Sequence, residues 1–238
     1  MCGSVCPLPQ AQSTLVFWRC EESGKVHSSQ SGFLPNHNTY ELILRLTEHA
    51  WESRLRNSVL HALLVDINKA YDSEWHNGLR YKLREQLGIR GRLYFWIDDF
   101  LRDRAGRAVL NGKKSRFHKI NVGVPQGACI SPLLWLVYVN DLPALIEDLV
   151  QIGIFADDVA IWPKPVGCAP ADIDKAKQQL QDATDKMDEW ATKWRLLLSP
   201  KKTQYIQLRH PNKTKYDKSP ITLKGNAIEP NPTSSTWG

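Results

Sequence analysis

The stretch IGIFADDVAIW, residues 152–162, places two adjacent aspartates, Asp157 and Asp158, inside an otherwise apolar run. Buried carboxylates are costly unless a positive charge neutralises them, and this run contains no Lys or Arg. Successive residues of a strand face opposite sides, so both aspartates reach one site only where the alternation breaks. We therefore predict a tight β-hairpin that bends at residues 156–158 and presents its carboxylates at an edge or floor of a sheet.

A third carboxylate, Asp66, ends the apolar run VLHALLVD at residues 59–66, which predicts a buried strand. If this strand pairs beside the hairpin, Asp66 and Asp157 lie close together. Clustered carboxylates repel one another, and one takes up a proton unless a cation neutralises the group. Such oxygen ligands suit Mg²⁺ or Mn²⁺, and a pair of these ions can hold the attacking and leaving oxygens of a phosphoryl transfer. An adjacent pair of aspartates is more often a solvated turn than a metal site. The choice between these two interpretations therefore depends on the other motifs in the chain.

Composition limits the classes of protein that fit. The chain has 238 residues, 42% of them hydrophobic, which is enough for one sizeable domain or two small ones. A formal charge of +6 and a pI near 9.0 fit a polyanionic partner. The five cysteines are odd in number and lack zinc-type spacing, so we expect a reduced, intracellular setting. No apolar run approaches the ~20 residues that a membrane span needs. The first residues lack a basic region followed by a long apolar one, so we do not expect them to act as a secretory signal.

Periodicity predicts a mixed α and β chain without the regular alternation of a doubly wound parallel sheet. Helices are expected over residues 40–56, with a cap at Asn38 or Thr39, and over 77–87, 91–102, 132–146 and 171–197. Strands are expected at 59–66, in both halves of 152–162, and at 203–208. Asn111-Gly112 and residues 221–228 predict further hairpins, and residues 1–28 are expected to be irregular.

Several motifs follow one another in a defined order. They are SSQSGFLPNHNT (28–39), LLVDINKAYDSEWHNGL (63–79), FLRDRAGRAVLNGKKSRF (100–117), GVPQGACISPLLWLVYVNDLP (123–143), IGIFADDVAIW (152–162) and DEWATKWRLLLSPKKTQYIQL (188–208). This order resembles the reverse transcriptase of non-LTR retrotransposons, most closely the jockey-like group, from about residue 29 to residue 238. The resemblance implies an α+β right-hand polymerase: partial fingers over 29–58, and a palm over 59–238 whose antiparallel sheet is backed by helices.

The resemblance also implies roles for individual residues. Asp66 and Asp157 match the two metal-binding aspartates of the palm, and Asp158 matches the second acid of the hairpin motif, so that two Mg²⁺ ions, or Mn²⁺, are expected here. Ile67 would lend its backbone carbonyl to a metal. Tyr71 matches an aromatic side chain that lies against the sugar 2′ position and excludes ribonucleotides, although a role as a core aromatic is the alternative.

Two further motifs match positions around the substrate. Gln126 and Gly127 match the loop that packs against the incoming nucleotide and template, whereas an ordinary Pro-Gly turn is the plainer interpretation. Lys202 matches a lysine near the triphosphate that donates a proton to pyrophosphate; its neighbour Lys201 is an alternative, and so is a solvated basic pair. The implied partners are an RNA template, a DNA primer and dNTPs, with no membrane, in the nucleus or cytoplasm.

Some positions depart from the family pattern. Leu34 stands where Arg is usual, Glu74 where an apolar residue is usual, and Ala128 where Ser is usual. The chain stops about where the primer-grip turn begins, so we expect the thumb to be absent. The sequence therefore predicts an RNA-directed DNA polymerase that transfers nucleotides from dNTP to a primer 3′-OH, present as a truncated fragment. The alternatives are a non-catalytic remnant that binds nucleic acid or a partner and, less favoured by the jockey-like motifs, an intron-encoded maturase.

Overall fold

The computed structural model describes residues 26–209 and 219–231. The chain divides into two compact units: unit 1 is Met1–Val26 with Lys69–Asn140, and unit 2 is His27–Asn68 with Asp141–Gly238. The segment expected to be irregular, residues 1–28, lies outside the described residues except for its last three. The expected boundary between fingers and palm at residue 58 stays a prediction.

Unit 2 is built on an antiparallel sheet whose long central strand is β1 (Val59–Asn68). Strand β7 (Asp158–Trp162) pairs with β1, and β6 (Gln151–Phe155) pairs with β7. Strands β8 (Leu197–Leu198) and β9 (Gln204–Arg209) also pair with β1. The strands predicted around both carboxylate motifs are therefore present and adjacent, and the α+β prediction is confirmed.

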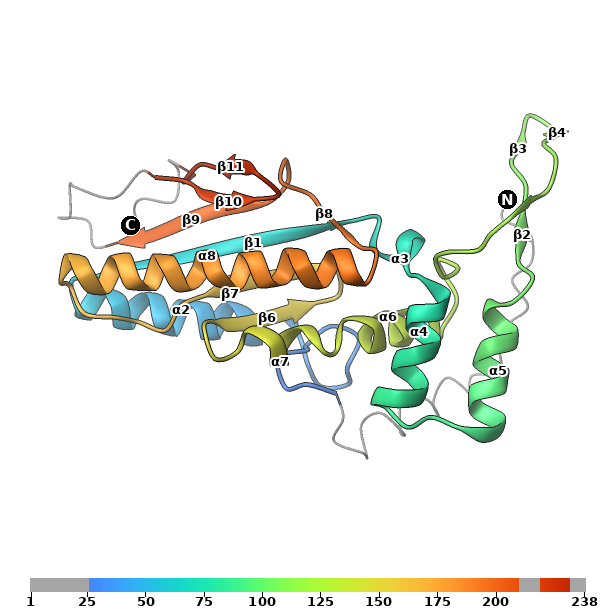
Figure 1. Cartoon of the computed structure of the whole chain (residues 1–238), viewed down its shortest axis with the longest axis horizontal. Coiled ribbons are helices and arrows are strands. Elements are labelled where there is room, and N and C mark those ends of the chain that lie inside the picture. Colours follow the sequence, from blue (N-terminus) through green and yellow to red (C-terminus); the bar gives the residue numbers. More distant parts are fainter. Residues whose placement is uncertain (1–25, 210–218, 232–238) are drawn as a thin grey trace. The chain divides into compact units, whose positions relative to one another are not determined.

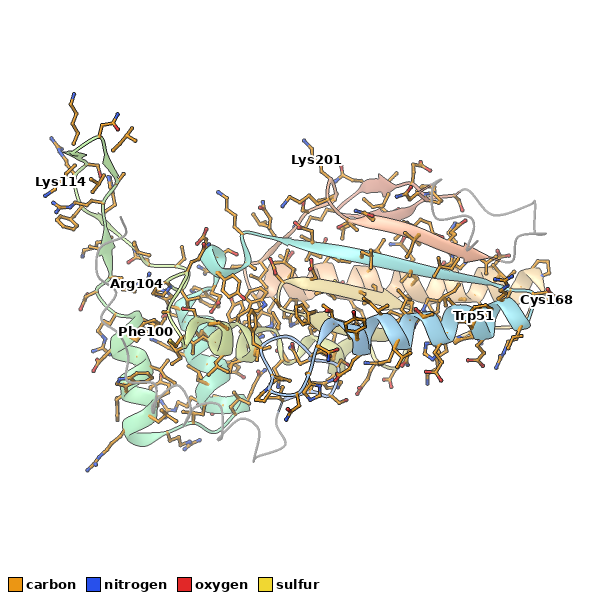
Figure 2. All side chains as sticks on the ribbon, turned by 180° about the vertical axis from the view of Figure 1, so that it is seen from behind. Trp51, Phe100, Arg104, Lys114, Cys168 and Lys201 are labelled. Carbon is orange, nitrogen blue, oxygen red and sulfur yellow. The ribbon has the colours of Figure 1, made fainter. Side chains whose placement is uncertain are left out.

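Two helices cover opposite faces of this sheet, α2 (Thr39–Leu55) and α8 (Pro170–Lys193) (Figures 1 and 2). The side chain of Asn38 accepts a hydrogen bond from the Tyr40 amide, as the predicted N-cap requires. On the α2 face the core gathers apolar residues from three strands and the helix: Leu60, Ala62, Trp162 and Leu208, with Leu46 and Ala50. On α8 the buried residues recur at helical spacing, at Ala176, Leu180, Ala183, Met187 and Ala191. A predicted terminal hairpin, β10 (Ile221–Leu223) with β11 (Asn226–Ile228), lies beside α8.

Unit 1 consists of short helices and a hairpin. The helices are α3 (Ala70–Ser73), α4 (His76–Tyr81) continuing into a π-helical turn η1 (Lys82–Gln86), α5 (Gly91–Leu101) and α6 (Ser131–Val139). Four two-residue strands form two short ladders: β2 (Ala105–Gly106) with β5 (His118–Lys119), and β3 (Val109–Leu110) with β4 (Lys113–Lys114). The turn between β3 and β4 is the predicted Asn111-Gly112, where both residues have positive φ.

Two predicted helix boundaries are wrong. The single helix expected over 132–146 is two helices, α6 and α7 (Leu142–Ile146), because Pro143 has no amide to donate and starts a new helix instead of continuing the old one. The helix expected to reach residue 197 ends at Lys193. Arg195 takes the left-handed conformation, with φ of 59°, and the chain turns into β8.

None of the helices within residues 26–209 and 219–231 combines the length and apolar character needed to cross a bilayer.

Candidate active site

The β6–β7 hairpin carries the paired aspartates at its bend. Phe155 and Asp158 form the last pair of the ladder, so the turn consists of Ala156 and Asp157. Ala156 has φ of 58°, a left-handed conformation that a two-residue hairpin turn favours even though it is costly for a residue other than glycine. The predicted bend is confirmed, and the alternation of sides breaks between the two aspartates as expected.

Asp66 lies directly opposite Asp158 in the β1–β7 ladder. Residues opposite one another in antiparallel strands have Cβ atoms about 5 Å apart on the same face of the sheet. Asp158 is therefore the acid that lies opposite Asp66 in the ladder. The sequence predicted that Asp66 and Asp157 lie close together, and that closeness stays a prediction. Asp157 lies one residue away, in the turn.

The three carboxylates interact electrostatically. Burial, then the negative charge of Asp157, then that of Asp66, raise the pKa of the Asp158 carboxyl above its usual range. Clustered acids without a bound cation show this rise in pKa, and a cation bound among them would lower the pKa instead. This region therefore favours a ligand with positive charge.

A cavity of about 420 Å³ opens on the α2 side of the sheet and contains two of the three acids. Its lining combines apolar residues with a few polar ones: Leu42, Leu64, Val65, Asp66, Gly153, Asp158, Val159, Ala160, Lys202 and Gln204. Lys202 Nζ lies 3.5 Å from each oxygen of the Asp66 carboxylate. This is long for a charge-assisted hydrogen bond, and Asp66 Oδ2 is buried with no donor among the described residues.

The backbone around Lys202 is tied to the same strand as Asp66. The Ser199 amide donates to the Asp66 carbonyl at 2.9 Å, and the Ser199 carbonyl accepts from the amides of Lys202 and Thr203. These bonds form a compact turn that directs Lys202 into the cavity. Lys201 does not line the cavity, and Figure 2 shows it extending outward from the turn between β8 and β9.

The segment SSQSGF supports the hairpin from its other edge. Ser29 and Ser31 exchange backbone hydrogen bonds with Ile154 of β6, each at 2.9 Å. A Cβ at Gly32 would lie only 2.3 Å from the Ala156 amide nitrogen, so glycine is required for this segment to reach the turn. The sequence identified the motif, but nothing in its pattern indicated that it packs against the bend that carries Asp157.

The carboxylates fit a divalent metal whose coordination is completed by a substrate. Among residues 26–209 and 219–231, no three His, Cys, Asp or Glu side chains converge to hold a metal by themselves. Mg²⁺ is commonly bound by one or two carboxylates together with substrate phosphates, not by a cage made of protein alone. The facing carboxylates of Asp66 and Asp158, with the unsatisfied Oδ2 atom, match that kind of site.

The remaining predicted residues divide between the two units. Ile67, in unit 2, is buried in β1 and pairs with Leu198. Tyr71, in unit 1, packs at a tilt against the buried Trp135, with ring centroids 5.7 Å apart. In the same unit the Gln126 amide donates to the Asp72 carboxylate at 3.2 Å, and Gly127 has φ of 88°.

Two relatives are similar in sequence to most of this chain. The RNA-directed DNA polymerase from the mobile element jockey of Drosophila funebris is 32% identical over 205 residues, which cover 84% of this chain and 21% of that protein. The jockey polymerase of Drosophila melanogaster is 31% identical over 179 residues, or 73% of this chain and 19% of that protein. The chain thus spans about a fifth of the length of these relatives.

Solved structures of low identity share the fold. Telomerase from Candida albicans, solved in complex with a fragment of telomeric RNA, matches with a TM-score of 0.65 and 12% identity over 94% of this chain and 37% of its own. Telomerase from Candida tropicalis truncated from its C-terminal domain matches with a TM-score of 0.59 and 14% identity over 91% of this chain and 42% of its own.

A family model described as reverse transcriptase (RNA-dependent DNA polymerase) matches residues 13–222. This match spans both units and all of the motifs that carry carboxylates. It confirms the resemblance on which the sequence interpretation rested, and it begins at residue 13, before the expected start at about residue 29. The chain belongs to the reverse transcriptase family and is similar to the polymerases of non-LTR mobile elements.

Proposed function

We propose that this chain is the catalytic palm, with partial fingers, of an RNA-directed DNA polymerase from a mobile element. The observation that carries the proposal is the pairing of Asp66 with Asp158 in a cavity that also contains Lys202. The family match supports the reaction class, and the substrates are an RNA template, a DNA primer and dNTPs.

The carboxylates form the reacting end of the site. Asp66 and Asp158 provide facing oxygens, Asp157 provides a third carboxylate from the turn, and Ile67 provides a backbone carbonyl. When bound, two divalent cations, Mg²⁺ or Mn²⁺, would lower the pKa of the primer 3′-hydroxyl and neutralise the triphosphate. Lys202 brings a mobile positive charge to the same cavity, where it neutralises the leaving pyrophosphate and donates a proton to it.

The family pattern assigns the selection and positioning of the nucleotide to Tyr71, Gln126 and Gly127. Tyr71 is held by its contact with Trp135, and its ring excludes a ribose 2′-hydroxyl by bulk. Gln126 and Gly127 form a loop in which the glycine takes a conformation costly for other residues, so that backbone approaches the nucleotide closely. These roles follow the family pattern residue by residue.

A second candidate is a non-catalytic remnant of such a polymerase. The observation in its favour is Glu74, which is fully buried with no hydrogen-bond partner for either carboxylate oxygen among the described residues. A buried polar group without partners is destabilising, and a chain no longer selected for activity tolerates such a change.

Titration of Mn²⁺ by calorimetry tests the proposed metal site. We expect weak binding to the chain alone and tighter binding with a non-hydrolysable dNTP, because the triphosphate completes the coordination. Asp66→Asn or Asp158→Asn should weaken binding by about tenfold or more, since an interaction with a charged group contributes about 1.5 kcal/mol or more.

The matched control is Asp174→Asn, which neutralises an exposed acid on α8 and should leave the affinity unchanged. Equal affinity in Asp66→Asn, Asp158→Asn and Asp174→Asn would remove both strand acids as ligands and favour the remnant.

A further inference from the structure

The hairpin over residues 104–119 has a charge of +6, which equals the net charge of the whole chain. Its sequence, RAGRAVLNGKKSRFHK, contains six basic residues and no Asp or Glu; the six are Arg104, Arg107, Lys113, Lys114, Arg116 and Lys119. The 25 Lys and Arg outside the hairpin balance the 25 Asp and Glu of the chain. The excess of +6 that characterises this protein is therefore concentrated in 16 residues.

Five of these six cations are available to a partner. Arg104, at the base of the hairpin, is half-buried and donates to the Gly123 carbonyl at 2.6 Å, so its role is structural. Every residue from Arg107 to Lys119 is exposed, and Figure 2 shows Lys114 at the far end of the hairpin from Arg104. Within the described ranges, none of the five exposed cations pairs with an acidic side chain.

An aromatic ring lies among these charges. Phe117 is 64% exposed, and the Arg107 guanidinium lies over its ring at 4.7 Å from the centroid. The turn adds exposed apolar surface, since Leu110 is 75% exposed. Exposed apolar groups interleaved with cations that pair with no acidic side chain match a ligand that carries both negative charge and flat apolar faces. Single-stranded nucleic acid is such a ligand, because its unstacked bases pack on aromatic side chains while its phosphates attract Lys and Arg.

We propose that the 104–119 hairpin is a binding surface for single-stranded RNA. Arg107, Lys113, Lys114, Arg116 and Lys119 bind phosphates, and Phe117 stacks on a base. A duplex offers the phosphates but hides its base faces, so the aromatic ring favours a single strand. The choice of RNA rests on the proposed function, whereas the contact itself requires neither metal nor nucleotide.

Fluorescence anisotropy with a labelled oligouridine RNA of about 16 nucleotides tests this surface, using the full chain without metal. The logarithm of the affinity should fall with the logarithm of the salt concentration with a slope of about −3.5, as five phosphate contacts on a single strand predict. The triple variant Lys113→Gln, Lys114→Gln, Arg116→Gln should bind at least about tenfold more weakly at low salt and lower the slope by about two.

A matched triple variant controls for net charge. Lys164→Gln, Lys175→Gln, Lys186→Gln removes the same charge from exposed positions outside the hairpin and should bind like the parent. Phe117→Ala should weaken binding about tenfold while keeping the parent's salt slope, because stacking releases no counterions. Since all the hairpin substitutions are exposed, the melting temperature should stay unchanged in every variant.

Four outcomes overturn the proposal. One is equal loss of affinity in the two triple variants, which would make the effect one of net charge alone. Another is unchanged binding by Phe117→Ala together with equal affinity for duplex RNA, which would leave a non-selective phosphate contact. The third is hairpin-dependent binding to vesicles of anionic lipid without binding to RNA, and the fourth is no measurable RNA binding at low salt. A chain that binds RNA through this hairpin but fails the Mn²⁺ titration would disprove the metal site and leave this surface intact.

Discussion

Replacing Asp66 by alanine is expected to lower the rate of templated nucleotide addition by about a thousandfold or more. Metal-assisted charge stabilisation contributes several kcal/mol to a phosphoryl-transfer transition state, and about 4 kcal/mol corresponds to about a thousandfold in rate. Asp66 faces Asp158 and has an unsatisfied buried oxygen, so its removal takes away half of the paired donor set.

The same substitution should leave the fold intact. Asp66 raises the pKa of Asp158 by its negative charge, so the alanine variant loses a repulsive interaction in the metal-free protein. It also loses the contact with Lys202, but that contact is long and exposed and contributes little to stability. We therefore expect its melting temperature to equal or exceed that of the parent. Loss of activity with retained stability would distinguish a functional role from a structural one.

Primer extension on an RNA template is the appropriate assay. The chain spans about a fifth of the length of its relatives. The assay therefore uses a chimera in which this chain replaces the matching 205-residue segment of the Drosophila funebris jockey polymerase. Asp174→Asn in the same background is the control and should extend primers like the parent. A folded parent chimera that adds no nucleotide, or an Asp66→Ala chimera that keeps a tenth of the parent rate, would contradict the proposed activity.

Replacing Glu74 by leucine is expected to stabilise the chain by about 2 kcal/mol at neutral pH, since a buried polar group without partners costs about 1–3 kcal/mol. Glu74 is fully buried in unit 1, and neither of its oxygens has a hydrogen-bond partner among the described residues. Most core substitutions destabilise, so a gain of this size from a single change would be unusual.

The stabilisation should also depend on pH. Burial raises the pKa of Glu74 well above its ordinary value of 4.5, so the folded state holds a proton that the unfolded state has released. The parent therefore loses stability as the pH rises above 4.5 towards the raised pKa, by at most about 1.4 kcal/mol per pH unit. The leucine variant lacks this loss, and its advantage grows over that window.

Urea unfolding of both proteins at several pH values measures this difference. Glu85→Leu is the control, because Glu85 is exposed beside Arg84 and its removal should shift stability little and without pH dependence. A Glu74→Leu protein that is less stable than the parent, or whose advantage is constant with pH, would show that Glu74 has a partner in solution.

Most of the site's framework could be predicted from sequence because it depends on local pattern. The apolar run that ends at Asp66 specifies a strand, and the interrupted run around Asp157 specifies two strands joined by a bend. The bend is needed because two adjacent acids on a regular strand would face opposite sides of the sheet. The Asn38 cap and the Asn111-Gly112 turn are likewise local signals with a direct backbone cause.

What the sequence missed depends on contacts between distant segments. The register that sets Asp158, and not Asp157, opposite Asp66 is fixed by pairing over the whole length of β1. The sequence matched Lys202 to the motif lysine and left Lys201 as an alternative, and the turn tied to the Asp66 carbonyl places Lys202, and not Lys201, at the cavity. The closeness of Gly32 to Ala156 also arises from packing, for which its neighbours in sequence provide no signal. Glu74 differs, because the sequence already marked it as standing where an apolar residue is usual, and the structure buries it.

Anomalous diffraction from crystals of the chain grown with Mn²⁺ and a non-hydrolysable dNTP tests the central claim most directly. The proposed site predicts an anomalous peak at about 2.1 Å from one carboxylate oxygen of Asp66 and one of Asp158. The peak should disappear in Asp66→Asn and persist in Asp174→Asn. Mn²⁺ peaks only at other positions, with none between Asp66 and Asp158 at saturating metal and nucleotide, would contradict the account.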